Sequence, residues 1–130
     1  MYKAISQDIQ ITVMPEFLPD QSDPDEERFF WAYTIEIVNL SQRTVQLMSR
    51  HWRITDGRGR VEEVRGPGVV GEQPILAPGG SFRYTSGCPL PTPSGIMAGT
   101  YRFVDEAGRS FEAQIPAFSL DSPHAARVLN

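Results

Sequence analysis

Residues 29–38 read FFWAYTIEIV, and this stretch decides the fold class. Large apolar side chains recur at every second position, namely Phe29, Trp31, Tyr33, Ile35 and Ile37. Successive side chains of a β-strand point to opposite sides of its sheet, so this period of two places all five on one face. Aromatic and β-branched residues also favour strands. The stretch therefore predicts a central strand with one face in the core.

The same alternation occurs on both sides of this strand. It predicts further strands within residues 9–13, 45–54, 60–64, 82–84, 101–103 and 111–115, separated by turn sequences such as 56–59, DGRG. Proline cannot donate to a sheet ladder, so we expect Pro15 and Pro116 to close two of these strands and Pro89 to interrupt a third. The tail from residue 119 is expected to hold a short helical turn at most.

One predicted strand changes phase. Its apolar residues occupy odd positions at Val45 and Leu47 and even positions at Trp52 and Ile54. A slip of one residue turns side chains to the other face, so we expect a β-bulge or bend within residues 48–50.

About seven short strands joined by turns, with no helical period, indicate an all-β antiparallel sandwich of the immunoglobulin or fibronectin type III kind. The Cys–Trp–Cys core of antibody domains is absent, so we expect a variant without a disulfide. A chain of 130 residues is the length of one domain, and we assign residues 1–130 to it.

Composition and charge narrow the classes of partner. The chain has 12 Lys and Arg against 16 Asp and Glu, a net charge of −4, so we expect no nucleic-acid binding, which favours basic surfaces. There is no apolar run of about 18 residues and no signal-peptide core, so we expect no membrane contact. A single cysteine, Cys88, forms no intrachain disulfide. These features predict a cytoplasmic protein.

Residues 66–71, GPGVVG, match the pattern G-x-G-x-x-G. One reading is a phosphate cradle in which Gly66, Gly68 and Gly71 let backbone amides approach a pyrophosphate. That motif needs a following helix, and residues 72–78, EQPILAP, cannot form a regular one because of their prolines. The other reading is a rigid loop whose glycines adopt positive φ.

Four apolar residues, Val69, Val70, Ile75 and Leu76, fall within or beside this loop. They either plug one end of the core or form an exposed patch that marks a partner surface. Leu90, Ile96 and Met97 in the next long loop leave the same two alternatives open.

Sites for metals or covalent catalysis have little support in the spacing of residues. The acidic stretch 20–27 lacks the pattern of a calcium loop, so a solvated connection is the simpler reading. His51, His124 and Cys88 are far apart in sequence, and no short ligand spacing joins them. A Cys88–His51 nucleophile pair is weaker than the reading of Cys88 as a small buried residue. We therefore expect no catalytic residues, no bound metal and no cofactor.

Several segments resemble the ApaG family, also called CorD. They are residues 52–56 (WRITD), 64–74 (VRGPGVVGEQP), 84–87 (YTSG) and 115–120 (IPAFSL), with Gly95, Met97, Gly99, Tyr101 and Phe111. The resemblance covers nearly the whole chain and implies a stand-alone bacterial member with a fibronectin type III-like sandwich. It also implies an association with cobalt resistance and magnesium efflux. Eukaryotic members append the domain to F-box adaptors and to a polymerase-interacting protein, and a nucleotide-binding role for the glycine motif has been suggested for the family.

We therefore expect a non-enzymatic protein-interaction module. Its candidate loop residues are Gly66, Gly68, Val69, Val70, Gly71 and Glu72. The alternative is a pyrophosphate-containing nucleotide bound at the same loop, and direct binding of Co²⁺ or Mg²⁺ by acidic side chains comes third. A protein surface predicts that Val69→Asp or Val70→Asp abolishes binding with the fold intact, whereas a phosphate cradle predicts sensitivity to Gly68→Val. The edge strands of a sandwich also leave a homodimer open.

Overall fold

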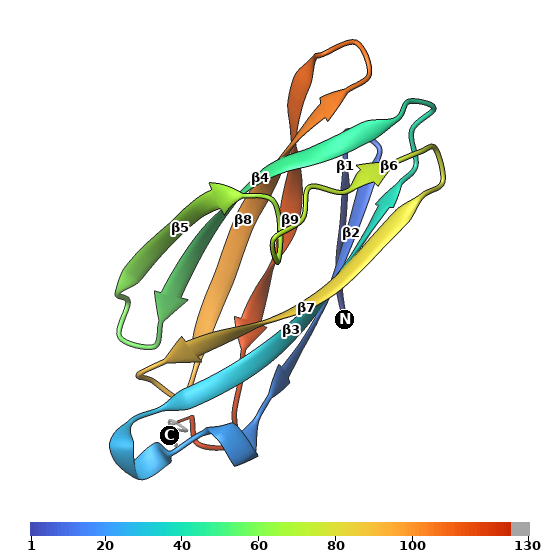
Figure 1. Ribbon diagram of the computed structural model, residues 1–130. Coiled ribbons are helices and arrows are strands. Elements are labelled where there is room, and N and C mark those ends of the chain that lie inside the picture. The colour runs from blue at the N-terminus through green and yellow to red at the C-terminus, as the bar shows by residue number, and fades with distance from the viewer. Residues whose placement is uncertain (126–130) are drawn as a thin grey trace.

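The computed structural model describes residues 1–125, which form two antiparallel β-sheets packed face to face (Figure 1). The first sheet has the order β1 (Tyr2–Ser6), β2 (Ile9–Phe17), β3 (Phe29–Asn39) and β7 (Ser81–Leu90). The second has the order β5 (Val61–Pro67), β4 (Val45–Asp56), β8 (Gly95–Asp105) and β9 (Ser110–Leu120), with the short β6 (Ile75–Leu76) paired to β4. The expected all-β sandwich is confirmed.

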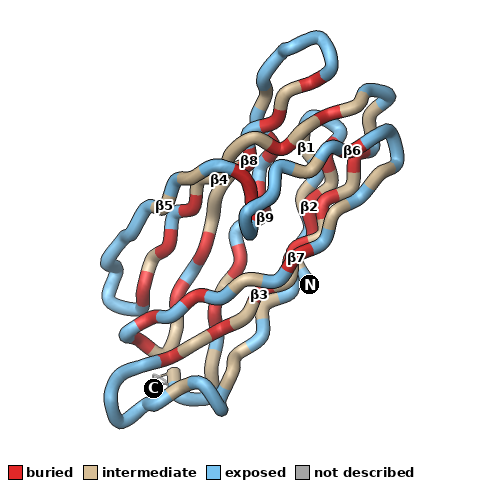
Figure 2. Tube along the Cα trace, in the orientation of Figure 1, coloured by how far each residue is buried: buried red, intermediate tan, exposed pale blue. Residues whose placement is uncertain are grey.

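Strand β3 lies inside the first sheet, between β2 and β7, as its sequence predicts. Its alternate residues from Phe29 to Asn39 are buried, and the residues between them are half-buried. Figure 2 shows the same alternation of buried and accessible positions along the neighbouring strands. The largest fully buried side chains between the sheets include Trp31, Tyr101, Phe103 and Phe118.

The expected bulge lies at Met48 in β4. The pairing of β4 with β8 shifts register between Leu47 and Ser49. Val45 and Leu47 before the shift and Trp52 and Ile54 after it are all buried, so the extra residue keeps both halves of the strand facing the core.

The structure has nine strands among its described residues, where the sequence predicts about seven. Strand β1 was not predicted, because only Tyr2 among its inward residues is large and its turn to β2 lacks the usual glycine. Gln7 and Asp8 form that turn with φ of 51° and 60°, a conformation in which glycine is the common residue.

Strand β2 continues through Pro15 to Phe17, so the expectation that Pro15 closes the strand is wrong. The Leu40 N–H donates to the Asp8 carbonyl (2.8 Å), which places the ladder bonds between β2 and β3 on even-numbered residues of β2. The nitrogen of Pro15 therefore faces the β1 side, where pairing has already ended opposite Val13. No ladder bond is lost.

Strands β7 and β9 also contain prolines. β7 reaches Leu90 through Pro89, so Pro89 does not interrupt it; an edge strand tolerates proline where the missing donor faces outward. β9 extends to Leu120 past Pro116, so Pro116 does not close it. A register shift in the β8–β9 pairing lies between Met97 and Gly99, which makes the proline part of a bulge. The tail from residue 119 is expected to hold a short helical turn at most. Its last part, residues 126–130, lies outside the described residues.

The acidic stretch 20–27 forms a surface connection with two short 3₁₀ turns, η1 (Pro19–Gln21) and η2 (Pro24–Glu26). These turns bury no residue, as expected for a solvated segment. In residues 1–125 no helix is long and apolar enough to cross a membrane.

The two sides of the sandwich differ. On one side β1 and β2 pack against β9, and the Tyr2 and Ser119 hydroxyls are hydrogen-bonded (2.9 Å). The Gln114 N–H donates to the Ser6 hydroxyl (2.8 Å) on the same side. On the opposite side the sheets end in β7 and β5, and we call this the open side (Figure 1). The glycine-rich loop follows β5 there.

Candidate interaction site at the glycine-rich loop

The glycine-rich loop is a tight hairpin at the end of β5. The Val69 N–H donates to the Glu72 carbonyl (2.8 Å), and the Glu72 N–H donates to the Val69 carbonyl (2.9 Å). The two residues between them, Val70 and Gly71, have φ of 44° and 80°. Two consecutive positive φ angles define a type I′ turn, which usually carries Asn-Gly or Gly-Gly. We call residues 69–72 the tip hairpin.

Gly68 positions the tip hairpin on β4. Its φ is +60°, and its N–H donates to the Met48 carbonyl (2.9 Å) at the β4 bulge. A Cβ atom at this position would lie 2.2 Å from the Glu72 carbonyl oxygen. Only glycine fits, both for its backbone conformation and for its space.

Gly66 makes room for Arg50. The phase change in β4 turns the Arg50 side chain to the inner face, where its Nη1 donates to the Pro67 and Gly68 carbonyls (2.9 Å each). A Cβ on Gly66 would lie 3.0 Å from this Nη1 atom. The guanidinium therefore lies across Gly66 and fixes the start of the loop. Sequence reasoning missed Arg50, although the predicted bulge places it in phase with Trp52.

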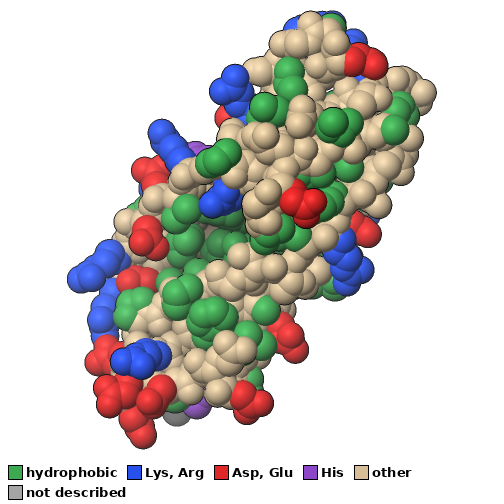
Figure 3. Space-filling view, in the orientation of Figure 1, with side chains coloured by type: hydrophobic (Ala, Val, Ile, Leu, Met, Phe, Trp, Pro, Cys, Tyr) green, Lys and Arg blue, Asp and Glu red, His purple; other side chains and the backbone are tan. Residues whose placement is uncertain are grey.

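The four apolar loop residues divide evenly between core and surface. Val69 and Leu76 are buried in the core, with 1% and 4% of their surface exposed. Val70 and Ile75 are exposed, at 54% and 68%. Val69 and Leu76 therefore belong to the core, as the first reading predicts, whereas Val70 and Ile75 are exposed, and their role as a partner surface stays a prediction. Leu90 and Met97 are likewise buried, whereas Ile96 is exposed. Hydrophobic side chains gather along the open side between β5 and β7 (Figure 3).

Most backbone donors of the loop are already engaged within the protein. The N–H groups of Gly68, Val69 and Glu72 donate to the carbonyls described above, and Gly66 pairs with Arg50 in the β4–β5 ladder. The chain continues into β6, and no helix follows, as the prolines predict. A phosphate at this loop would lack the helix N-terminus and most of the free amides on which dinucleotide sites depend.

A cluster of phenols lies behind the loop between the sheets. The Tyr84 hydroxyl of β7 is hydrogen-bonded to the Tyr101 hydroxyl of β8, and both side chains are buried. Burial raises the pKa of both phenols and of Tyr33, and the nearby Arg50 guanidinium partly opposes each rise. Arg50 lies opposite Tyr101 in the β4–β8 ladder, so the loop is linked to β7 through the Tyr101–Tyr84 pair.

The comparisons with known proteins place the chain in a family. The model of the ApaG domain matches residues 19–105. The Protein ApaG of Methylocella silvestris is 69% identical over 130 residues, with all of both chains covered, and that of Beijerinckia indica is 66% identical over the same length. The chain belongs to the ApaG family.

Two solved structures are similar to the chain in sequence and in fold. A crystal structure of a Bordetella pertussis protein with the provisional name ApaA is 53% identical. It has a TM-score of 0.87, with 91% of this chain and 96% of that one covered. A structural-genomics target, SoR45, is 42% identical with a TM-score of 0.86, and 98% and 96% of the two chains are covered. The sandwich fold is thus shared with both solved structures over nearly the full length of the chain.

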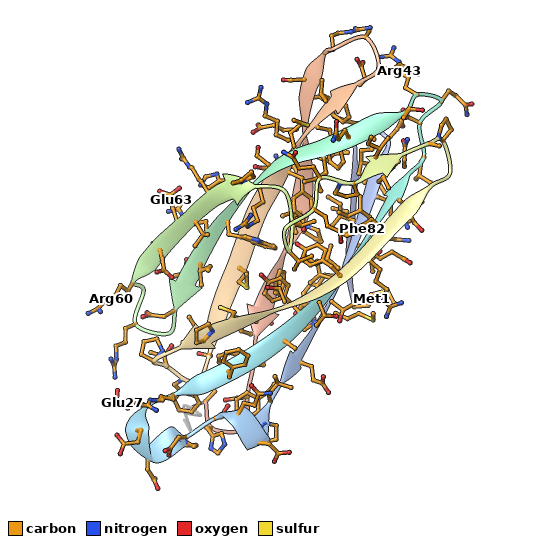
Figure 4. All side chains as sticks on the ribbon, viewed as in Figure 1. Met1, Glu27, Arg43, Arg60, Glu63 and Phe82 are labelled. Atoms are coloured by element: carbon orange, nitrogen blue, oxygen red, sulfur yellow. The ribbon has the colours of Figure 1, made fainter. Side chains whose placement is uncertain are left out.

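The other candidate residues of the sequence, His51, His124 and Cys88, lie in different parts of the fold. His51 Nε2 is 2.8 Å from Glu63 Oε1, and Glu63 projects from β5 in Figure 4. His124 packs against the Phe17 and Phe29 rings. Cys88 is buried, and burial together with the Glu62 carboxylate raises the pKa of its thiol to about 11. Within residues 1–125 no three His, Cys, Asp or Glu side chains are grouped to hold a metal ion.

A hollow of about 700 Å³ lies at the turns that join β1–β2, β3–β4 and β8–β9. Arg43, one of its lining residues, lies at the end of the molecule opposite Glu27 (Figure 4). Arg43 Nη1 donates to Asp105 Oδ2 (3.0 Å), and the N–H groups of Arg109 and Ala107 donate to Asp105 Oδ1. These backbone bonds hold the pKa of Asp105 below its usual range. The carboxylate orders the β8–β9 turn.

Proposed function

We propose that this member of the ApaG family is a non-enzymatic protein-interaction module that presents the tip hairpin to a protein partner. The observation that carries the proposal is Val70. It is an exposed, β-branched, apolar residue held in the left-handed region, with φ of 44°. Such a residue at positive φ is an outlier and costs roughly 1–3 kcal/mol of strain.

Neither the backbone nor the core accounts for a valine at this position. Glycine or asparagine would relieve the strain in the turn, and the side chain gains little from burial because more than half of its surface is exposed. The residues around it are fixed, since Val69 is buried and Arg50 holds the loop carbonyls. A rigidly held apolar tip supports a role in contact with another molecule.

Substitutions at Val70 separate binding from folding. Because Val70→Gly removes the strain, we expect it to raise the free energy of unfolding by about 1 kcal/mol. We expect both Val70→Gly and Val70→Asp to weaken binding, the latter at least about tenfold. The partner is captured from an extract of the source cells and purified. Calorimetry then measures its affinity for the wild type and for each variant.

The matched control is Val61→Asp, which changes another exposed valine of the same segment of chain. We expect it to leave affinity unchanged to within about twofold. Wild-type affinity in folded Val70→Asp protein would contradict the proposal, and so would a loss of stability in Val70→Gly.

The alternative is a pyrophosphate-containing nucleotide at Gly66, Gly68 and Gly71. Because the N–H groups of Gly66 and Gly68 are engaged and no helix follows the loop, we expect ATP and diadenosine tetraphosphate, each with and without Mg²⁺, to produce no saturable shift of these three amides at about millimolar concentration. Amide NMR spectra of labelled protein measure this directly. Saturable shifts centred on the three glycines would replace the protein partner with a nucleotide as the ligand of the loop.

We propose that the family association with cobalt and magnesium reflects the protein partner and not a metal ion bound by this chain. The residues best suited to bind a transition metal are His51, Cys88 and His124. They have separate surroundings, because His51 lies beside Glu63, Cys88 is buried in the core and His124 packs against Phe17. The single thiol is free and buried, which fits a reducing compartment, and we place the interaction in the cytoplasm.

A further inference from the structure

Strand β7 has an unpaired edge whose backbone groups can be identified. The Asn39 N–H donates to the Gly80 carbonyl (2.9 Å), so the ladder bonds of β7 to β3 fall on even-numbered residues of β7. The N–H and C=O groups of Ser81, Arg83, Thr85 and Gly87 consequently point to the free edge. Pro89 is also odd-numbered, so the N–H that it lacks would have pointed to the same free edge. In residues 1–125 no backbone hydrogen bond outside the β3 ladder engages these four residues.

The two edge strands of the open side are protected to different degrees. β5 carries adjacent charges at Glu62 and Glu63. Glu62 alternates with Val64 and Gly66 along the strand, so it faces inward as they do. Inward charges are one way in which natural sheets block pairing at an edge. β7 is ten residues long and keeps a regular register with β3 from end to end. It has one charged side chain, Arg83, and its only proline lies next to its last residue.

We propose that the partner of this module adds an extended peptide strand to the free edge of β7. This inference rests on the proposed function and specifies the binding mode. A second copy of the chain fits less well, because a two-fold axis beside β7 would bring two β5 strands, each with Glu62 and Glu63, to the same side. A single peptide strand avoids this repulsion.

The added strand lies near the tip hairpin. Arg50 donates to the Gly68 carbonyl and lies opposite Tyr101 in the β4–β8 ladder, and the Tyr101 hydroxyl is hydrogen-bonded to Tyr84 of β7. The loop and β7 are therefore joined through the Arg50–Tyr101 pair, and we infer that a strand on β7 passes beside the loop that presents Val70. Main-chain hydrogen bonds supply affinity in this mode of recognition, and alternate side chains supply specificity.

The side chains of β7 define the chemistry of the partner strand. Arg83 is exposed on the outer face, and Glu36 lies opposite it on β3 without a salt bridge within the described residues, so on its free side the guanidinium favours an acidic residue of the added strand. Phe82 is half-buried on the inner face against the core, so it favours an apolar neighbour. The expected partner segment is an extended peptide that alternates apolar residues with polar or acidic ones.

Proline substitution at Thr85 tests the edge. Thr85→Pro removes an N–H that faces outward and leaves the β3 ladder complete, whereas Thr85→Val keeps that N–H. Both variants lose the hydroxyl contact with Thr34 (2.9 Å), so they form a matched pair. The probe is a library of random dodecapeptides displayed on phage and selected on the wild-type chain. We expect selected peptides to shift the amides of Ser81, Arg83, Thr85 and Gly87 in NMR spectra.

We expect Thr85→Pro to weaken the selected peptides at least about tenfold and Thr85→Val by less than about twofold. Arg83→Glu leaves the backbone unchanged and gives a second test should Thr85→Pro fail to fold: acidic peptides should bind it several-fold more weakly. Equal effects of the two Thr85 variants, shifts outside β7, or no selected peptide with Kd below about 100 µM would overturn the inference. If Val70→Asp abolishes partner binding while Thr85→Pro does not, only the binding mode fails.

Discussion

Gly68→Ala lowers the free energy of unfolding by roughly 2–4 kcal/mol, which we expect to be the largest effect of any added methyl group in the glycine-rich loop. The methyl group would occupy a left-handed position and lie 2.2 Å from the Glu72 carbonyl oxygen. That oxygen accepts the Val69 N–H, so it cannot move without opening the tip hairpin. Denaturant unfolding followed by tryptophan fluorescence measures the loss.

Gly71→Ala is the matched control for this prediction. Gly71 also has positive φ, at 80°, but a Cβ there would meet no atom within 4 Å. It should therefore show only the cost of the left-handed conformation, about 1 kcal/mol. Similar losses for the two variants would mean that backbone conformation alone, and not the contact with Glu72, makes Gly68 necessary.

The geometry of Gly68 also decides which substitutions can distinguish a nucleotide from a protein partner at the loop. From sequence alone, sensitivity to Gly68→Val indicates a phosphate cradle. In the structure any side chain at Gly68 disrupts the hairpin, whatever the loop binds. Substitution of this glycine therefore does not distinguish a nucleotide from a protein partner, and the discriminating substitutions are those at Val70.

The fold could be predicted because one signal, the alternation of large apolar residues, dominates the sequence. It places β3 in the centre of its sheet, and the change of phase between Leu47 and Trp52 locates the bulge at Met48. The same signal fails for β1, whose inward residues after Tyr2 are small and whose turn lacks glycine. Prolines mislead where the missing N–H faces no strand, as at Pro15 and Pro89.

The candidate loop could be located from sequence, but the reason for each of its glycines could not. Gly66 makes room for a side chain from β4, Gly68 avoids a carbonyl of its own hairpin, and Gly71 completes a two-residue turn. The first two reasons depend on contacts between residues that only the folded chain brings together. The motif is the same as that of a phosphate loop, yet each glycine here has a packing or conformational cause.

Val69→Asp is the second large effect, and it corrects an expectation drawn from the sequence. An exposed pair of valines predicts that either one can become aspartate with the fold intact, but Val69 has 1% of its surface exposed and lies in the core cluster. A carboxylate placed there without a partner should lower the free energy of unfolding by about 3–5 kcal/mol at neutral pH. A domain of this size has about 5–15 kcal/mol in total, so much of the protein's stability would be lost.

The loss at position 69 should depend on pH in a defined direction. Burial raises the pKa of the introduced carboxyl above its value of about 3.9 in the unfolded chain. The folded state therefore binds the proton more tightly, so the pH-dependent part of the penalty is absent below pH about 4 and grows as pH rises to the folded-state pKa, above which it is constant. Val69→Ala, which removes volume but adds no charge, should lose about 2 kcal/mol with no such pH dependence.

Val70→Asp should remain within about 1 kcal/mol of the wild type, because its side chain is exposed and aspartate tolerates the left-handed region. Urea unfolding of the three variants at pH 4 and pH 7 measures these differences. Equal stability of Val69→Asp and Val70→Asp at pH 7 would show that Val69 does not seal the core, and the rigid presentation of Val70 would lose its support.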